Sequence, residues 1–289
     1  MFSKLCKYEF RSLARTLGPV YLAVIAVTII NTFIGLGSIT GGNLNQALRG
    51  NSVFSSLISI LQGVSAFVYF GVMVALAVLT LIIIIQRFYK GLLSDEGYLM
   101  FTLPVKPWQL IAAKGSVAFV MSVASMLVAL LSILILVCGE VGPVTFFSEL
   151  ARGWTALMAE LSRWLPLWPL YVVEFLLLAI VSGLASLYQI YFAMALGHLS
   201  GKHRIMMSVV AYVAISTILN IIFGFSMVFL SNFPPIQRFF DQLNSLSFME
   251  WGNLFIQLIF LLSLLVGLVQ LALFFFGTER ILAKRLNLE

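Results

Sequence analysis

The sequence predicts an all-α, polytopic membrane protein with six transmembrane helices, and two observations support this. Of its 289 residues, 61% are hydrophobic and 10% are charged, whereas soluble domains carry about 25% charged residues. The apolar residues form six long runs, and a helix needs about 20 such residues to cross a bilayer. The runs show none of the ten-residue alternation that is typical of a membrane β-barrel. A single transmembrane domain over residues 1–289 is expected, with spans at about 17–36, 63–85, 110–137, 167–196, 206–230 and 254–276.

Residues 2–16, before the first span, are expected to form a helix lying on the inner membrane surface. At about 100° per residue, Phe2, Cys6, Phe10, Leu13 and Leu17 fall on one side. The opposite side is basic and carries Lys4, Lys7, Arg11 and Arg15. This pattern is typical of an interfacial helix, although a simple anchor that orients the first span explains it equally well. Gly18-Pro19 predicts a break before the span.

Orientation follows from the basic residues, because cytoplasmic loops retain Lys and Arg. One side of the predicted topology carries the following residues: Lys4, Lys7, Arg11, Arg15, Arg87, Lys90, Lys106, Lys114, Lys202, Arg204, Arg280, Lys284 and Arg285. The other side carries Arg49, Arg152, Arg163 and Arg238. Both termini are therefore expected in the cytoplasm. The net charge of +6 then reflects topology and attraction to the inner leaflet, and nucleic acid is not an expected partner.

Residues 145–165, on the predicted outer side, form an amphipathic pattern. Apolar and aromatic residues recur at spacings of three and four, while Glu149, Arg152, Glu160 and Arg163 occupy the remaining face. We expect a helix that lies flat at the outer interface.

Few residues of the chain are candidates for catalysis or for binding a metal or cofactor. His198 and His203 lie five residues apart, a spacing that suits neither a metal pair on a helix face nor a catalytic triad. The stretch 197–202 has three residues between its glycines where a phosphate-binding P-loop has four. Glu174 lies inside an apolar run, where a carboxylate is a functional candidate, but its position near the outer headgroups favours a tolerated interfacial acid. Asn220 and Gln257 are further polar residues within spans, typical of contacts between helices. No metal site, no cofactor and no enzymatic activity are expected in this chain.

A short polar segment, residues 94–104, separates spans two and three on the predicted cytoplasmic side. Ser94, Asp95 and Glu96 resemble a helix N-cap followed by acidic residues in the first turn. Gly97 weakens the helix, and the next four residues offer an apolar and aromatic face: Tyr98, Leu99, Met100 and Phe101. Residue chemistry fits two arrangements equally well: a helix at 94–103 that docks into a groove of a partner, or an interfacial helix tucked under the membrane.

The stretch Asp95-Glu-Gly-Tyr-Leu-Met-Phe-Thr-Leu-Pro-Val105 resembles a segment of the six-span permeases of type II ATP-binding-cassette (ABC) exporters of Gram-positive bacteria. Residues 4–11, 197–205 and 285–289 are similar to the same family, so the resemblance covers essentially the whole chain. It implies an interfacial N-terminal helix and a coupling helix at 94–103 that contacts a separate ATPase subunit. It also implies a second permease subunit, which is either the same chain or a relative, and ATP and Mg²⁺ bound to the ATPase.

The resemblance predicts an exporter permease of the bacterial plasma membrane that moves an amphipathic, peptide, drug or lipid-like substrate. Its expected ATPase contacts are Asp95, Glu96, Gly97, Tyr98, Leu99, Met100 and Phe101, with Arg204 as a weaker contact. Two alternatives remain open: a membrane anchor or sensory scaffold that transports nothing, and an autonomous carrier or channel. Neither the cargo nor the choice between homodimer and heterodimer follows from the sequence.

Overall fold

The structure, a computed structural model, is helical wherever it describes secondary structure. It describes residues 2–39, 52–93, 97, 105–165, 167–200, 203–232, 234 and 248–284, and no strand occurs among them. The elements in chain order are α1 (Phe2–Ile39), α3 (Ser52–Phe88), the π-helical turn η1 (Tyr89–Leu93), α5 (Pro107–Val141), α6 (Pro143–Trp164), α7 (Trp168–His198), α8 (Arg204–Asn232) and α10 (Phe248–Lys284).

Six of these helices are long and apolar enough to cross a membrane, which confirms the predicted number of spans. The qualifying stretches are Phe2–Phe33, Gly63–Leu93, Pro107–Gly139, Trp168–His198, Arg204–Ser226 and Phe255–Ala283. The chain is therefore a multi-pass, all-α protein of the membrane type. Several helices continue beyond the apolar runs, because polar residues at a helix end extend the hydrogen-bonded ladder without needing to lie in hydrocarbon.

The helices gather into two compact units. Unit 1 consists of residues 1–2, 87–116 and 158–289, and unit 2 of residues 3–86 and 117–157. The prediction of one transmembrane domain over 1–289 said nothing of such a division.

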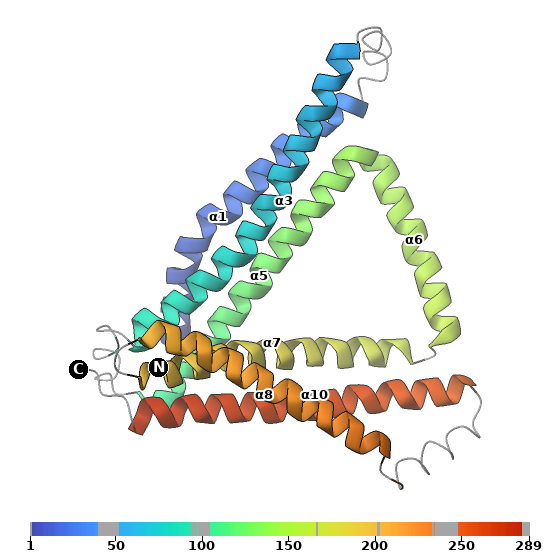
Figure 1. Cartoon of the computed structure of the whole chain (residues 1–289). Coiled ribbons are helices and arrows are strands. Elements are labelled where there is room, and N and C mark those ends of the chain that lie inside the picture. The colour runs from blue at the N-terminus through green and yellow to red at the C-terminus, as the bar shows by residue number, and fades with distance from the viewer. Residues whose placement is uncertain are drawn as a thin grey trace. The chain divides into compact units, whose positions relative to one another are not determined.

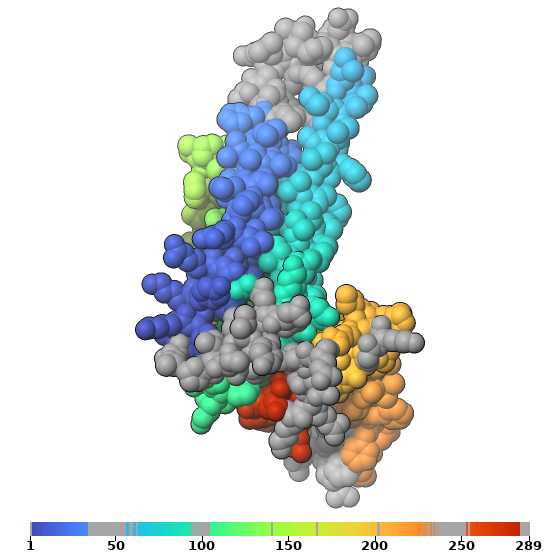
Figure 2. All heavy atoms as spheres, turned by 90° about the vertical axis from the view of Figure 1, so that its left-hand side faces the viewer, coloured from blue at the N-terminus to red at the C-terminus, as the bar shows by residue number. Residues whose placement is uncertain are grey.

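In unit 2, α1, α3 and α5 run side by side (Figure 1), and Figure 2 shows α1 in blue against α3 in cyan. Leu13 and Leu17 of α1 are buried in one cluster with Val117 and Met121 of α5. The apolar side that the sequence predicts for residues 2–16 therefore packs, at Leu13 and Leu17, against a neighbouring helix.

The predicted break at Gly18-Pro19 is wrong, because α1 is one continuous helix with Pro19 in its interior. A proline removes one backbone hydrogen bond, but long membrane helices tolerate this where neighbouring helices support the backbone. Here Leu13 and Leu17 before Pro19, and Tyr21 after it, all pack on the same cluster.

Hydroxyl groups join the three helices of unit 2 in two layers. In the first layer, the Tyr21 hydroxyl lies 2.7 Å from Ser125 Oγ, and Thr80 Oγ1 lies 3.0 Å from the same oxygen. In the second layer, Ser132 Oγ lies 2.6 Å from Thr28 Oγ1 and 2.8 Å from the Tyr69 hydroxyl. The layers are seven residues apart on α1 and α5, about 10 Å along each helix. We call these six residues the hydroxyl seam.

The second layer has a defined direction of donation. Thr28 donates its proton to the carbonyl of Val24, 2.7 Å away. Because a hydroxyl has one proton, Thr28 must accept from Ser132, and Ser132 must then accept from Tyr69. The successive hydrogen bonds in such a row polarise one another, which strengthens each of them. Further along α1, Asn31 adds another link, since its Nδ2 donates to the Ser65 carbonyl at 2.8 Å.

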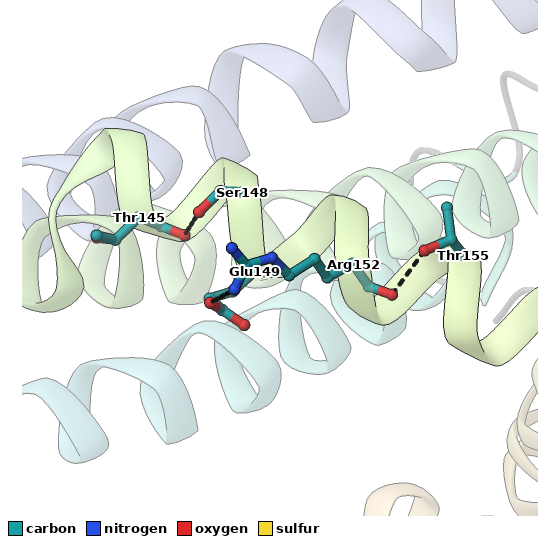
Figure 3. A network of polar contacts seen from close by, with 5 residues as sticks. All are labelled: Thr145, Ser148, Glu149, Arg152 and Thr155. Carbon is teal, nitrogen blue, oxygen red and sulfur yellow. Dashed lines mark hydrogen bonds and ion pairs between the residues drawn. The ribbon is translucent and has the colours of Figure 1, made fainter.

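Helix α6 confirms the helix predicted over residues 145–165. Its polar stripe is visible in Figure 3, where Arg152 Nη1 donates to Glu149 Oε1 at 2.8 Å and the hydroxyls of Ser148 and Thr155 donate to carbonyls one turn earlier. None of its residues is buried. The large apolar side chains of the opposite face are exposed, among them Phe147, Leu150, Trp154 and Leu157. The helix is therefore amphipathic with an uncovered apolar face.

In unit 1, α7 is the central helix and packs against both α10 and α8. Figure 1 shows α7 and α10 running side by side. Glycines permit the closest approaches: a Cβ on Gly277 would lie 2.6 Å from the Phe192 ring, and one on Gly197 would lie 2.4 Å from the Ser208 backbone nitrogen. Gln189 also bridges α7 and α8, because its Nε2 donates to Ser216 Oγ at 2.8 Å.

Candidate functional site

The candidate site lies in unit 1 where α3 ends and segment 94–104 begins. The last turn before this segment, η1, is a π-helix, and its Gly91, Leu92 and Leu93 are buried. Single π-helical turns are rare and frequently mark functional positions. We call η1 together with Lys114, Tyr191 and His198 the η1 base.

An aromatic stack fixes the start of this turn. Phe88, the last residue of α3, stacks on Tyr191 of α7 with ring centroids 3.8 Å apart and an interplanar angle of 12°. Both side chains are 1% exposed. A buried aromatic pair contributes about 0.5–1.5 kcal/mol beyond the area that it buries, so α7 holds the end of α3 in place.

His198 holds the other end of η1. The His198 ring hydrogen-bonds to the backbone of Leu93, and its Nε2 lies 3.2 Å from Arg204 Nη1. A guanidinium can only donate, so Nε2 accepts and the proton of the neutral ring lies on Nδ1. Arg204, the predicted weaker ATPase contact, therefore lies next to the η1 base, whereas His203 is exposed.

Lys114 of α5 reaches η1 from a third helix. Its side chain is 4% exposed, and a Cβ built on Gly91 would lie 2.5 Å from Lys114 Nζ and 3.2 Å from its Cε. The ammonium group therefore lies directly against the backbone of the π-helical turn. On the following residue of α5, Gly115 leaves room for Tyr188 of α7, whose hydroxyl would lie 2.3 Å from a Cβ there.

Among the predicted ATPase contacts of segment 94–104, the structure describes Gly97. This residue is buried, and a Cβ on it would lie 2.6 Å from the carbonyl oxygen of Leu92. Glycine is thus required here because the backbone packs onto η1, a more specific reason than its low helix propensity. The other predicted contacts lie outside the described residues: Asp95, Glu96, Tyr98, Leu99, Met100 and Phe101.

The four basic residues predicted for the inner-leaflet face of α1 share one property in the structure. All of them are exposed, while Leu13 and Leu17 on the other side of the helix are buried. These residues are Lys4, Lys7, Arg11 and Arg15. Their charges therefore point away from the packing surface of α1, as the helical periodicity predicts.

The candidate polar residues within the spans have different environments. Asn220 is exposed and donates to the Ser216 carbonyl of its own helix at 2.9 Å. Gln257 is half-buried on α10. Glu174 is half-buried on α7, and its Oε2 is shielded from solvent without a hydrogen-bond partner among the described residues. One turn earlier, the Tyr171 hydroxyl donates to Asn253 Oδ1 at 3.0 Å.

Replacing Glu174 by glutamine is expected to raise the thermal stability of the purified chain in detergent micelles, by about 1 kcal/mol. A shielded carboxylate oxygen without a donor is costly, and a neutral amide is less so. Glu149→Gln is the matched control, because Glu149 is exposed, and it should leave the unfolding temperature nearly unchanged. A fall in stability for Glu174→Gln alone would show that the carboxylate has a stabilising partner.

The sequence assigned Lys114 to topology only and missed its place against η1. The available signal was its position inside the apolar run 110–137, because a cation within a span is rare and usually has a partner. The π-helical turn and the Phe88–Tyr191 stack left no such signal.

Among the described residues, no group of three or more His, Cys, Asp or Glu side chains could hold a metal ion. No protein-family model, curated protein or solved structure matches the chain.

Proposed function

We propose that the chain is the membrane-spanning permease subunit of an ATP-driven ABC exporter, located in the bacterial plasma membrane with both termini in the cytoplasm. A separate ATPase subunit that holds ATP and Mg²⁺ drives it, and a second permease subunit completes the transport path. The substrate is an amphipathic, peptide, drug or lipid-like molecule.

The observation that carries this proposal is the construction of the η1 base, which directly precedes segment 94–104 in the sequence. Helices α5 and α7 hold the end of α3 and the turn that follows it, through Phe88–Tyr191, His198–Leu93 and Lys114–Gly91. A segment that receives force from a partner needs such a rigid attachment to the helices that it moves. The resemblance of residues 95–105 to the coupling segment of exporter permeases supports the same role.

Charge supports the orientation. Arg87 and Lys90 flank the start of η1, and Lys106 precedes α5. The exposed basic residues of α1 are suited to the anionic inner leaflet. The uncovered apolar face of α6, rich in aromatic side chains, is suited to the outer headgroup region.

The first test is copurification of the full-length chain with an ABC ATPase subunit from its native host. The double replacement Tyr98→Ala and Phe101→Ala is expected to weaken ATPase binding at least tenfold and to abolish the stimulation of ATP hydrolysis by the permease. Aromatic anchors in docking surfaces each account for about 2 kcal/mol or more. Binding is measured with purified components in nanodiscs.

The control removes the same chemistry from the predicted outer side: Phe147→Ala with Trp154→Ala, both exposed on α6. This control should bind the ATPase like the wild type. Full ATPase binding and stimulation by the segment 94–104 variant would refute the coupling role. Binding without any substrate-dependent hydrolysis would favour the scaffold alternative, and transport by the purified chain alone in liposomes would favour an autonomous carrier.

A further inference from the structure

Lys114 is an unusual residue because it is a buried cation inside a helix of the membrane type. It is the eighth residue of α5, about 10 Å along the helix from Pro107. Its side chain is 4% exposed, so other protein atoms surround it almost completely. A charged group in such a place is expensive and usually has a functional reason.

The geometry around Lys114 points to η1 as that reason. The ammonium lies against Gly91, where a single added methyl group would approach Nζ to 2.5 Å. The backbone carbonyls at the C-terminal end of a helix carry partial negative charge, which favours a cation. Lys114 and Gly91 are thus a matched pair: the glycine leaves the room that the lysine fills.

We propose that Lys114 is a positioning residue that fixes η1, the turn that precedes segment 94–104 in the sequence, to α5. Of the three attachments, this one alone comes from α5. Its consequence for transport rests on the proposed function, whereas the attachment itself does not. Topology alone, through the retention of positive charge on the cytoplasmic side, would place no demand on Gly91.

A double-mutant cycle tests the pairing in the full-length chain. Gly91→Ala is expected to lower the unfolding temperature, because the ammonium must move. Lys114→Leu removes Cε and Nζ, so the same alanine should then cause less than half of that drop. Gly71→Ala is the matched control on α3, since nothing lies within 4 Å of a Cβ there, and its effect should be the same in both backgrounds. Additive effects of Gly91→Ala and Lys114→Leu would overturn the pairing.

A spin label separates positioning from general stability. In a background with Cys6→Ser and Cys138→Ser, a label attached at Leu99→Cys reports on segment 94–104, and one at Ser148→Cys reports on α6. Lys114→Leu should increase the mobility of the first label at least twofold and leave the second unchanged. Lys106→Leu, which removes an exposed charge just before α5, should change neither label. Unchanged mobility at position 99 would overturn the positioning role.

The same variants distinguish this inference from the proposed function. One outcome supports both the positioning role of Lys114 and the proposed function. In that outcome the double-mutant cycle and the label mobility at position 99 change as expected, and Lys114→Leu also weakens ATPase binding at least fivefold. If the wild-type chain binds no ATPase while the cycle and label results stand, the proposed function fails and the positioning role of Lys114 remains.

Discussion

Replacing Gly197 by valine is expected to separate α7 from α8 and to destabilise the chain by about 3 kcal/mol. A Cβ at this position would lie 2.4 Å from the backbone nitrogen of Ser208 and 2.5 Å from its Cα. Carbon atoms in contact need about 3.5 Å, so α8 must move by about 1 Å. The obstacle is backbone, which cannot rotate away as a flexible side chain can.

Stability is measured by thermal unfolding of the purified chain in micelles. Cross-linking between α7 and α8 shows whether these two helices have separated. Gly224→Val is the matched control on α8, because a Cβ there meets nothing within 4 Å. The control should stay within a few tenths of a kcal/mol of the wild type. Equal stability of the two variants would show that α7 and α8 do not approach each other at Gly197.

The second large loss of stability is expected when Ser132 in the hydroxyl seam is replaced by leucine. Ser132 is completely buried between Thr28 and Tyr69. Leucine adds volume where no space exists and leaves both neighbouring hydroxyls without their shared partner, so a loss of about 3 kcal/mol is expected. Ser132→Ala removes the hydroxyl without adding volume and should cost about 1 kcal/mol, near the value typical of hydrogen bonds between membrane helices.

A cycle with Thr28→Val assigns the energy to the hydrogen bond. In the Thr28→Val background, Ser132→Ala should cost less than it does in the wild type, because the acceptor of the Ser132 proton is already absent. An undiminished effect of Ser132→Ala in that background would mean that the Thr28–Ser132 bond contributes nothing to stability.

The number of spans and the amphipathic α6 followed from the sequence because both depend on composition and periodicity along one helix. The continuity of α1 did not, since whether Pro19 ends a helix depends on what its neighbours pack against. Val117 and Met121, about 100 residues away, supply that support.

The sequence likewise indicated some parts of the candidate site and not others. The sequence indicated segment 94–104 and Arg204, because charge and aromatic residues there interrupt the apolar pattern. It did not indicate the η1 base, whose parts come from η1 itself, α5 and α7. A close pair such as Gly91 and Lys114 leaves no periodic trace, because the two residues meet only when separate helices pack.

The hydroxyl seam has a consequence for how unit 2 responds to the electrical state of a membrane. A unit charge that crosses a potential of 100 mV gains or loses about 2.3 kcal/mol, but the six hydroxyls that join α1, α3 and α5 carry no net charge. Voltage therefore exerts no net force on these bonds, and ions in solution do not screen them as they screen surface charges. We therefore expect the hydroxyl contacts between the three helices to be the same in an energised and in a depolarised membrane.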